Sequence, residues 1–347
     1  MTPRERMIAA IQHREPDRVP ITMDFNRSTA QGIMNVGGPS ALERIMKHLG
    51  VETEEELRVR LGHDLRDVQP AWKSQDEWKD KEHCGWGPAL RQVRTMADFR
   101  RLWWPSHDQV WDYSSFERDL EEVLNLPQEY LVRGPGPQFW ELYRGWLGMV
   151  DALILLKEDP ELAQAMMRKI MDIYVDRSVY VMENWGDHID MQWGGDDLGM
   201  QDRLMMSPET FRDVLKPVYL EGHRRAKSVR PCYLHFHCCG SIPEIIGDLI
   251  ETGVDVLHPI QPKARGMDRR VLKQQYGDRL TFHGNVDTQE IMAFGTPEQV
   301  RAETLECFRA LGQGGGHILA PSHTIQPNMP VENVMAFFDT ALNECWY

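Results

Sequence analysis

The sequence predicts an α/β fold, an eight-stranded (β/α)8 TIM barrel with an N-terminal helical extension and an irregular insertion near the barrel mouth. A length of 347 residues suits one such barrel. Helix and strand patterns alternate through the second half of the chain, which is typical of parallel βαβ units. Seven strand candidates follow one another without a linker, which favours a barrel over an open sheet. We therefore expect residues 1–347 to form a single domain.

The helix starts are marked by capping residues. Thr2-Pro3-Arg4-Glu5 combines a capping box with proline at the first helical position. The same device recurs at Asp159-Pro160-Glu161, Ser207-Pro208-Glu209 and Thr296-Pro297-Glu298-Gln299. Apolar residues then follow at helical spacing, so helices are predicted to begin at these four places.

Short apolar runs between the helices predict strands. They lie at residues 19–25, 130–134, 189–194, 232–237, 254–259, 280–284 and 317–321. The eighth strand is not located, and we expect it before residue 130. We interpret the irregular region from about 50 to 130, which is rich in tryptophan and charge, as an insertion or cap near the barrel mouth and not as a second domain.

The composition excludes several classes of partner. With 39 basic and 53 acidic residues the net charge is −14, which disfavours binding to nucleic acid or to an anionic membrane surface. No run approaches the roughly 20 apolar residues of a membrane span. Charged residues stand where a signal peptide would need its apolar segment, so we expect a cytoplasmic protein. The six cysteines are few and irregularly spaced, which favours metal binding or catalysis over disulfides.

The densest candidate site is His237-Cys238-Cys239-Gly240, at the end of a predicted strand. Imidazole and thiolate are ligands that zinc prefers. His237 and Cys239 are two residues apart, so in an extended segment they face the same way and Cys238 faces the other. Ordinary core packing also uses buried cysteine and histidine, and spacing alone leaves both interpretations open.

Other polar residues are predicted at the same rim. His323 follows the strand at 317–321 and could complete a three-ligand zinc site with an open fourth position, or bind substrate, or close a loop hydrogen bond. Candidate catalytic residues are Asp196, Asp197 and His283, and candidate substrate-binding residues are Asp24, Asn26, Gln261 and Asn285. Each aspartate could instead cap the following helix.

Several motifs resemble those of the uroporphyrinogen decarboxylase superfamily. They are Thr2-Pro3-Arg4-Glu5-Arg6 with Glu15-Pro16-Asp17-Arg18-Val19-Pro20, then Gly284-Asn285-Val286-Asp287, and then His323-Thr324-Ile325-Gln326-Pro327 running into Pro330-Val331-Glu332-Asn333-Val334. The resemblance covers nearly the whole chain and is strongest from residue 188 onward. It implies a (β/α)8 barrel.

The superfamily has two chemical branches, and the resemblance is closer to the second. Metal-free decarboxylases carry an arginine-rich N-terminal loop for a substrate with many carboxylates, whereas Asp24-Phe25-Asn26-Arg27-Ser28 has a single arginine. Corrinoid-linked methyltransferases use a His-x-Cys-Gly zinc motif, which His237-Cys238-Cys239-Gly240 matches. Their third ligand is often a cysteine, where this chain has His323. That histidine also matches one retained in decarboxylases, so its role as a ligand stays open.

The resemblance therefore implies a zinc-dependent methyltransferase that moves a methyl group between a small molecule and a corrinoid. The chain lacks an Asp-x-His-x-x-Gly corrinoid signature, so cobalamin is expected on a separate partner protein. A homodimer is compatible with the sequence. The alternative is a metal-independent decarboxylase of another substrate, in which Asp196 or Asp197 protonates the carbanion. A non-catalytic binding protein is least favoured, because polar residues crowd the predicted rim.

Overall fold

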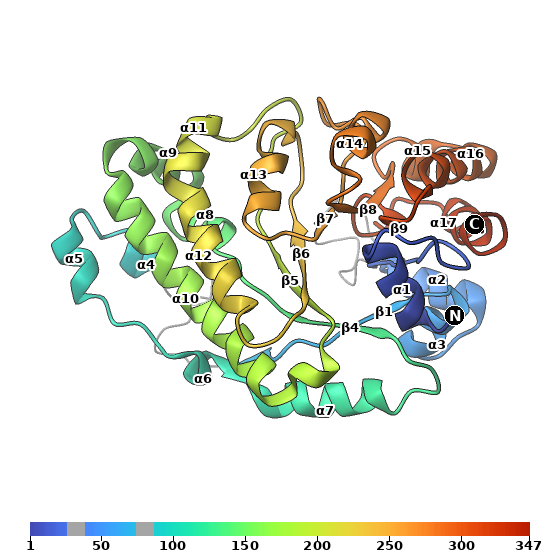
Figure 1. Cartoon of the computed structure of the whole chain (residues 1–347), viewed down its shortest axis with the longest axis horizontal. Coiled ribbons are helices and arrows are strands. Elements are labelled where there is room, and N and C mark those ends of the chain that lie inside the picture. Colours follow the sequence, from blue (N-terminus) through green and yellow to red (C-terminus); the bar gives the residue numbers. More distant parts are fainter. Residues whose placement is uncertain (26–38, 74–86) are drawn as a thin grey trace.

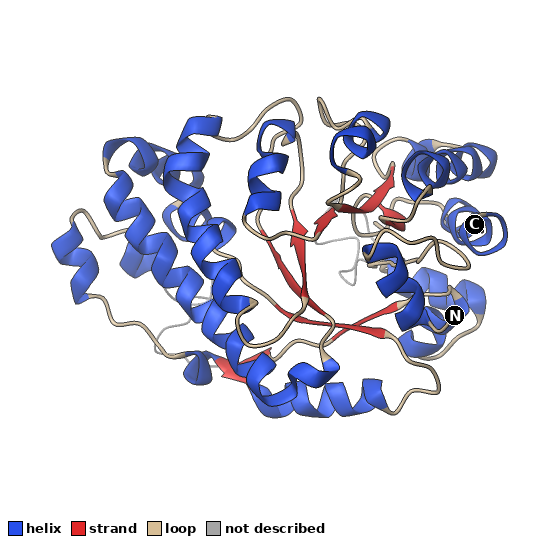
Figure 2. Cartoon of the chain, viewed as in Figure 1, coloured by secondary structure: helices blue, strands red, loops and turns tan. Residues whose placement is uncertain are grey.

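The computed structural model describes residues 1–25, 39–73 and 87–347. Its centre is a curled parallel sheet of seven strands, with helices along its outer side (Figures 1 and 2). The strand order within the described residues is β1 (Leu65–Asp67), β4 (Leu131–Pro135), β5 (Met191–Gly195), β6 (Tyr233–His237), β7 (Val256–His258), β8 (Thr281–Val286) and β9 (His317–Pro321). Every neighbouring pair is parallel. The predicted α/β class and six of the seven predicted strands are confirmed.

Two expectations about the N-terminal half need correction. The region interpreted as an insertion contributes β1 to the main sheet, which is the strand sought before residue 130. The run at 19–25 makes only isolated bridges, in which Ile21 pairs with both His63 and Leu319. Pro20 lies in that run without a backbone N–H to donate, although its carbonyl accepts from the Leu319 N–H at 2.8 Å.

The helices begin where their caps predict. Thr2 and Glu5 form the capping box of α1, and Asp159, Ser207 and Thr296 each accept a backbone N–H of the helix that follows. The helices are α1 (Pro3–Ile11), α2 (Ala41–Leu49), α3 (Glu54–Arg60), α4 (Gly87–Leu90), α5 (Met96–Arg101), α6 (His107–Val110), α7 (Tyr113–Leu124), α8 (Trp140–Leu147), α9 (Met149–Glu158), α10 (Pro160–Trp185), α11 (Pro208–Thr210), α12 (Lys216–Ala226), α13 (Ile246–Glu251), α14 (Arg269–Tyr276), α15 (Ile291–Phe294), α16 (Pro297–Cys307) and α17 (Val331–Glu344). Within the described ranges, none of them has the length and apolar character needed to cross a membrane.

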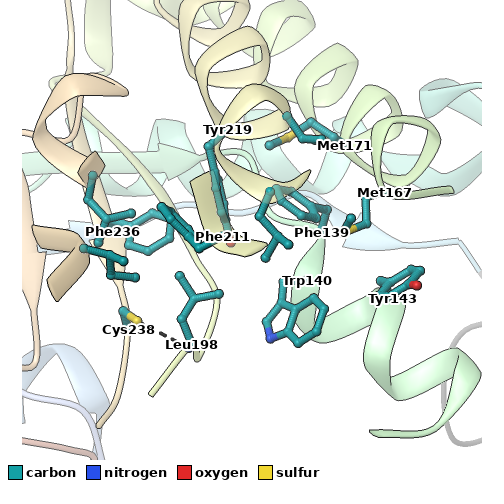
Figure 3. Packing of buried hydrophobic residues seen from close by; sticks show 14 of the residues in the cluster. Phe139, Trp140, Tyr143, Met167, Met171, Leu198, Phe211, Tyr219, Phe236 and Cys238 are labelled. Carbon is teal, nitrogen blue, oxygen red and sulfur yellow. Dashed lines mark hydrogen bonds between the residues drawn. The ribbon is translucent and has the colours of Figure 1, made fainter. Parts of the chain in front are cut away.

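The two ends of the sheet differ in character. At the amino-terminal end, Met7 and Ile11 of α1 pack against apolar residues near the starts of the strands, including Leu65, Leu131 and Met191. A larger apolar cluster fills the space between the sheet and helices α8, α10 and α12; Figure 3 shows part of it. At the carboxyl-terminal end, polar residues follow the strands, among them His237 at the end of β6 and His323 after β9. Parallel barrels carry their sites at the corresponding end.

Part of the tryptophan-rich region does lie near that end. The short strand β2 (Ala71–Trp72) begins a few residues after β1 ends and pairs antiparallel with β3 (Trp111–Asp112). The rings of Trp72 and Trp111 lie 4.2 Å apart between centroids. The same region thus supplies both a sheet strand and an aromatic wall near the mouth.

Candidate functional site

Three side chains converge at the carboxyl-terminal end of the sheet. His237 is the last residue of β6, Cys239 lies two residues later, and His323 lies two residues beyond β9. One potential ligand atom from each lies within 4.8 Å of the other two. The Cys239 Sγ is 3.4 Å from the His237 Nε2. The structure thus brings together the three residues predicted as metal ligands, which we call the His–Cys–His triad.

Two glycines allow the backbone to approach closely around the triad. Gly195 pairs with His237 across β5 and β6, and a Cβ on Gly195 would lie 2.4 Å from the His237 carbonyl oxygen. Gly240 turns the chain after Cys239 at φ +91°, where a Cβ would lie 2.5 Å from the carbonyl carbon of Gly199. A side chain at either position would push the β6 end out of place.

Hydrogen bonds fix the turn that carries Cys239. The Cys239 N–H donates to Asp197 Oδ1 at 2.8 Å, and the Gly240 N–H donates to Gln261 Oε1 at 2.8 Å. Gln261, a candidate substrate-binding residue from the sequence, therefore supports the backbone of the triad.

Cys238 faces away from the triad, as the strand alternation predicts. It is 2% exposed and belongs to the apolar cluster that contains Phe236 and Leu198. Its sulfur accepts the Leu198 N–H at 3.4 Å (Figure 3). The adjacent cysteines thus occupy opposite sides of the backbone.

The triad fits a zinc ion. Tetrahedral zinc with a Zn–S bond of about 2.3 Å and a Zn–N bond of about 2.0–2.1 Å places S and N roughly 3.5 Å apart, close to the observed 3.4 Å. His237 and Cys239 are half-buried and His323 is exposed, so solvent reaches the triad. Burial and the neighbouring Asp197 carboxylate raise the pKa of the Cys239 thiol. A bound cation is the usual way for a protein to hold such a thiol as thiolate.

The paired aspartates have separate environments. Although burial raises the pKa of Asp197, hydrogen bonding to His237 and to the Cys239 N–H outweighs it and holds the pKa at about 2. Asp197 is therefore ionised at neutral pH and places a negative charge beside the triad, 3.5 Å from His237 Nε2.

Asp196 lies behind the triad and not in it. Its carboxylate is fully buried and accepts from the Phe139 N–H, the Glu141 N–H and the Tyr219 hydroxyl at 2.8–3.1 Å. Burial raises its pKa to about 7 against these hydrogen bonds. It binds backbone N–H groups at the start of α8, which precedes it in the chain. It therefore does not cap the following helix, which was the alternative that the sequence left open.

Histidines also occupy the sheet interior beneath the triad. His258 Nδ1 lies 2.9 Å from His237 Nδ1, whereas His283, a candidate catalytic residue, contacts His235 at 2.8 Å and the Thr22 hydroxyl at 2.5 Å. Burial lowers the pKa values of His235 and His283 well below the usual range, so these rings are neutral. His258 was not among the predicted site residues; its signal in the sequence is a polar residue near the end of the strand predicted at 254–259.

Of the remaining predicted residues, Asn285 supports the backbone of a loop and Asp24 lines a cavity. Asn285 is buried, and its side-chain amide donates to the Ile260 carbonyl at 2.7 Å, so it holds the loop after β7. Asp24 lines a cavity beside Arg133. The Asp24 carbonyl accepts the Ile325 N–H at 2.7 Å, two residues beyond His323, so Asp24 lies near the triad. Asn26 lies outside the described residues.

Comparison with known proteins gives one family and two kinds of relative. A profile described as "Uroporphyrinogen decarboxylase (URO-D)" matches residues 141–343. The uroporphyrinogen decarboxylase of Coxiella burnetii (strain RSA 493 / Nine Mile phase I) is 22% identical over 270 residues, which cover 74% of this chain and 70% of that protein. The methylated-thiol–coenzyme M methyltransferase of Methanosarcina mazei is 24% identical and covers 97% of this chain and 88% of that protein. A solved structure titled "methyltransferase from Methanosarcina mazei" matches with a TM-score of 0.64, at 16% identity and 98% coverage of both chains, and supports the fold.

Proposed function

Because the chain belongs to the uroporphyrinogen decarboxylase family, we propose that it is a zinc-dependent methyltransferase that moves a methyl group between a small molecule and a corrinoid. The His–Cys–His triad carries this proposal, since its ligand atoms lie within 4.8 Å of one another at the carboxyl-terminal end of the sheet. The whole-length similarity to a thiol methyltransferase, covering 97% of the chain, supports the same branch. The corrinoid would be carried by a separate protein.

The chain's own residues would hold and orient the metal. His237 Nε2 faces the Cys239 sulfur, while His237 Nδ1 is held by His258, as expected for a ligating imidazole whose second nitrogen is fixed by a partner. Asp197 adds negative charge and ties down the Cys239 backbone. A bound zinc ion would supply Lewis acidity, either to keep a thiol ionised or to polarise a leaving oxygen.

The fold around this site is proposed to be a closed (β/α)8 barrel within one domain of residues 1–347. Ile21 bridges both the chain leading into β1 and strand β9. The Thr22 N–H donates to the Leu319 carbonyl and the Asp64 N–H to the Ile21 carbonyl. Residues 20–22 thus contact both edges of the seven-stranded sheet, next to β1 and next to β9, which supports them as the eighth strand that closes the barrel.

The decarboxylase alternative needs a carboxyl group that can donate a proton to carbon. Asp196 accepts three hydrogen bonds inside the core, and Asp197 accepts the Cys239 N–H and faces His237. Asp197 stays ionised, because its pKa is about 2. Asp196, whose pKa is raised to about 7, is fully buried behind the triad, where it does not meet a substrate. Both features favour the methyltransferase.

Protein purified without chelators is expected to contain about one zinc ion per chain and to transfer methyl groups between free cobalamin and a small-molecule thiol or methyl ether. Chelator treatment should abolish transfer, and added zinc should restore it, because the proposed reaction depends on the metal. Metal analysis and the change in corrinoid absorbance measure the two quantities. Metal-free protein that releases carbon dioxide from a carboxylated substrate would support the decarboxylase instead.

His258→Phe is expected to weaken zinc binding by about 10–100-fold, because the variant keeps a ring but removes the nitrogen that holds His237 Nδ1. Competition with a chromophoric chelator gives the affinity. The control is His223→Phe, which changes a buried histidine that contacts Thr252 on the outer side of the fold. Equal zinc affinities in the two variants would contradict a positioning role for His258.

A further inference from the structure

A cavity of about 440 Å³ opens at the carboxyl-terminal ends of β1, β4 and β5. This volume lies within the roughly 300–1,000 Å³ of small-molecule sites. Its walls include Asp24, Arg133, Arg177, Trp111, Tyr174 and Trp193. Trp193 lies two residues before Gly195, which pairs with His237, so the cavity is beside the triad.

Arg177 lacks a carboxylate partner among the described residues. It extends from α10 and is 5% exposed, and its one hydrogen bond to a described residue runs from Nη2 to the Gly136 carbonyl at 2.8 Å. Its Nε has no acceptor there. Burial lowers its pKa to about 10, which still leaves it charged at neutral pH. A buried charge without a counter-ion is costly, and a negatively charged ligand would offset that cost.

Other cations that line cavities are already paired. Arg133, in the same cavity, binds Asp67 at 2.8 Å. At the opposite end of the sheet, a cavity of about 660 Å³ is lined by Arg4 and Lys227, which pair with Asp190 and Asp255 respectively. Of these four cations, Arg177 is the one left without a carboxylate within the described residues.

Two aromatic rings lie against the same guanidinium. Its central carbon lies 4.4 Å from the Trp111 ring centroid and 4.8 Å from that of Tyr174. The two ring centroids are 5.5 Å apart, so both rings lie on the same side of the guanidinium. A ligand carboxylate would meet the edge of the guanidinium, where charge-assisted hydrogen bonds form. The Trp193 side chain is half-buried on the β5 side of the cavity. Aromatic walls favour a planar aromatic ligand over a saturated one.

We propose that this cavity binds a small aromatic carboxylate, with its carboxylate on Arg177 and its ring against Trp193. The substrate would be a methyl ether of such a carboxylate. Its oxygen–methyl bond would break, the methyl group would pass to the reduced cobalt of the partner protein's corrinoid, and the oxygen would leave as phenolate. Only this transfer step rests on the proposed function.

Benzoate is the probe for this site, and tryptophan fluorescence or calorimetry measures its binding to the purified zinc protein. Cyclohexanecarboxylate keeps the charge but lacks the aromatic ring, and benzyl alcohol keeps the ring but lacks the charge. Benzoate should bind at least tenfold more tightly than either. If all three bind alike, or benzoate does not bind, the proposal is overturned.

Arg177→Gln should weaken benzoate binding tenfold or more, whereas Arg168→Gln, on the exposed side of the same helix and paired with Glu221, should leave it unchanged. The melting temperature of Arg177→Gln should not fall, because an unpaired buried charge is removed. A lower melting temperature with unchanged benzoate affinity would assign Arg177 a structural role and overturn the proposal. Trp193→Leu should weaken benzoate but not cyclohexanecarboxylate.

The two proposals can fail separately. Methyl transfer to cobalamin by a protein that does not bind benzoate would overturn the aromatic-carboxylate site and leave the methyltransferase standing. Benzoate binding that depends on Arg177, in a protein without zinc or methyl transfer, would overturn the methyltransferase and leave the site standing.

Discussion

Cys239→Ala is expected to reduce the affinity for zinc by on the order of a hundredfold to a thousandfold and to lower methyl transfer to background. Structural zinc sites are worth roughly 10–16 kcal/mol over four ligands, so one ligand accounts for about 2.5–4 kcal/mol. The sulfur of Cys239 lies 3.4 Å from the His237 nitrogen, and removing it leaves only the imidazoles of His237 and His323 from the triad.

The neighbouring cysteine supplies a matched control. Cys238→Ala makes the same substitution one residue away, but its sulfur packs in the apolar cluster and accepts the Leu198 N–H. We expect it to cost about 1 kcal/mol of stability through the lost packing and to retain zinc and activity. Chelator competition and corrinoid absorbance measure both variants. Zinc loss in Cys238→Ala, or full zinc binding in Cys239→Ala, would contradict the assignment of the triad.

The orientation of these cysteines could be predicted because it is a local property. In an extended strand, alternate residues face opposite sides, and β6 runs up to His237. The convergence of His323 with them was predictable from topology, since the carboxyl-terminal ends of parallel strands meet at one end of the sheet. Whether the three residues bind a metal remains a prediction.

The roles of the two aspartates could not be predicted, because they depend on distant parts of the chain. Asp196 and Asp197 follow the same strand, yet Asp196 binds Tyr219 and the backbone of Phe139, while Asp197 binds the Cys239 N–H. Arg177 left no local signal either, because its surroundings come from β3 and from the loop after β4.

Strand prediction failed where the apolar character of a segment did not match its hydrogen-bonded pairing in the sheet. The strand β1 is short and contains Arg66 and Asp67, so it lacks an apolar run. Its place in the sheet comes from pairing with β4. The run at 19–25 is apolar enough to resemble a strand. However, Pro20 has no backbone N–H to donate, and the run forms only isolated β-bridges.

Asp64→Ala is expected to destabilise the fold by about 3–5 kcal/mol, the largest stability effect we predict, because it leaves the buried Arg18 without its counter-ion and leaves Arg6 with Asp17 alone. Asp64 is 1% exposed, and Arg6 and Arg18 are 7% exposed. Its oxygens accept from Arg6 Nη1 at 2.6 Å and from Arg18 Nη1 at 2.8 Å, and one also accepts the Ile21 N–H at 2.8 Å. One carboxylate thus ties α1 and the chain at 18–21 to the entry of β1.

Urea unfolding measures this loss, and Asp17→Ala is the control, because Asp17 also pairs with Arg6 but its side chain is 29% exposed. An accessible pair of this kind is worth at most about 1 kcal/mol, so the control should be much milder. The folded fraction of Asp64→Ala should still bind zinc, since Asp64 lies before β1 and the triad lies at the other end of the sheet. If the two variants lose the same stability, the buried carboxylate is not the tie between these segments. If instead Asp64→Ala alone is severely destabilised, the N-terminal motifs containing Arg6, Asp17 and Arg18 serve the shared fold, and their resemblance to the family carries no information about which reaction this chain catalyses.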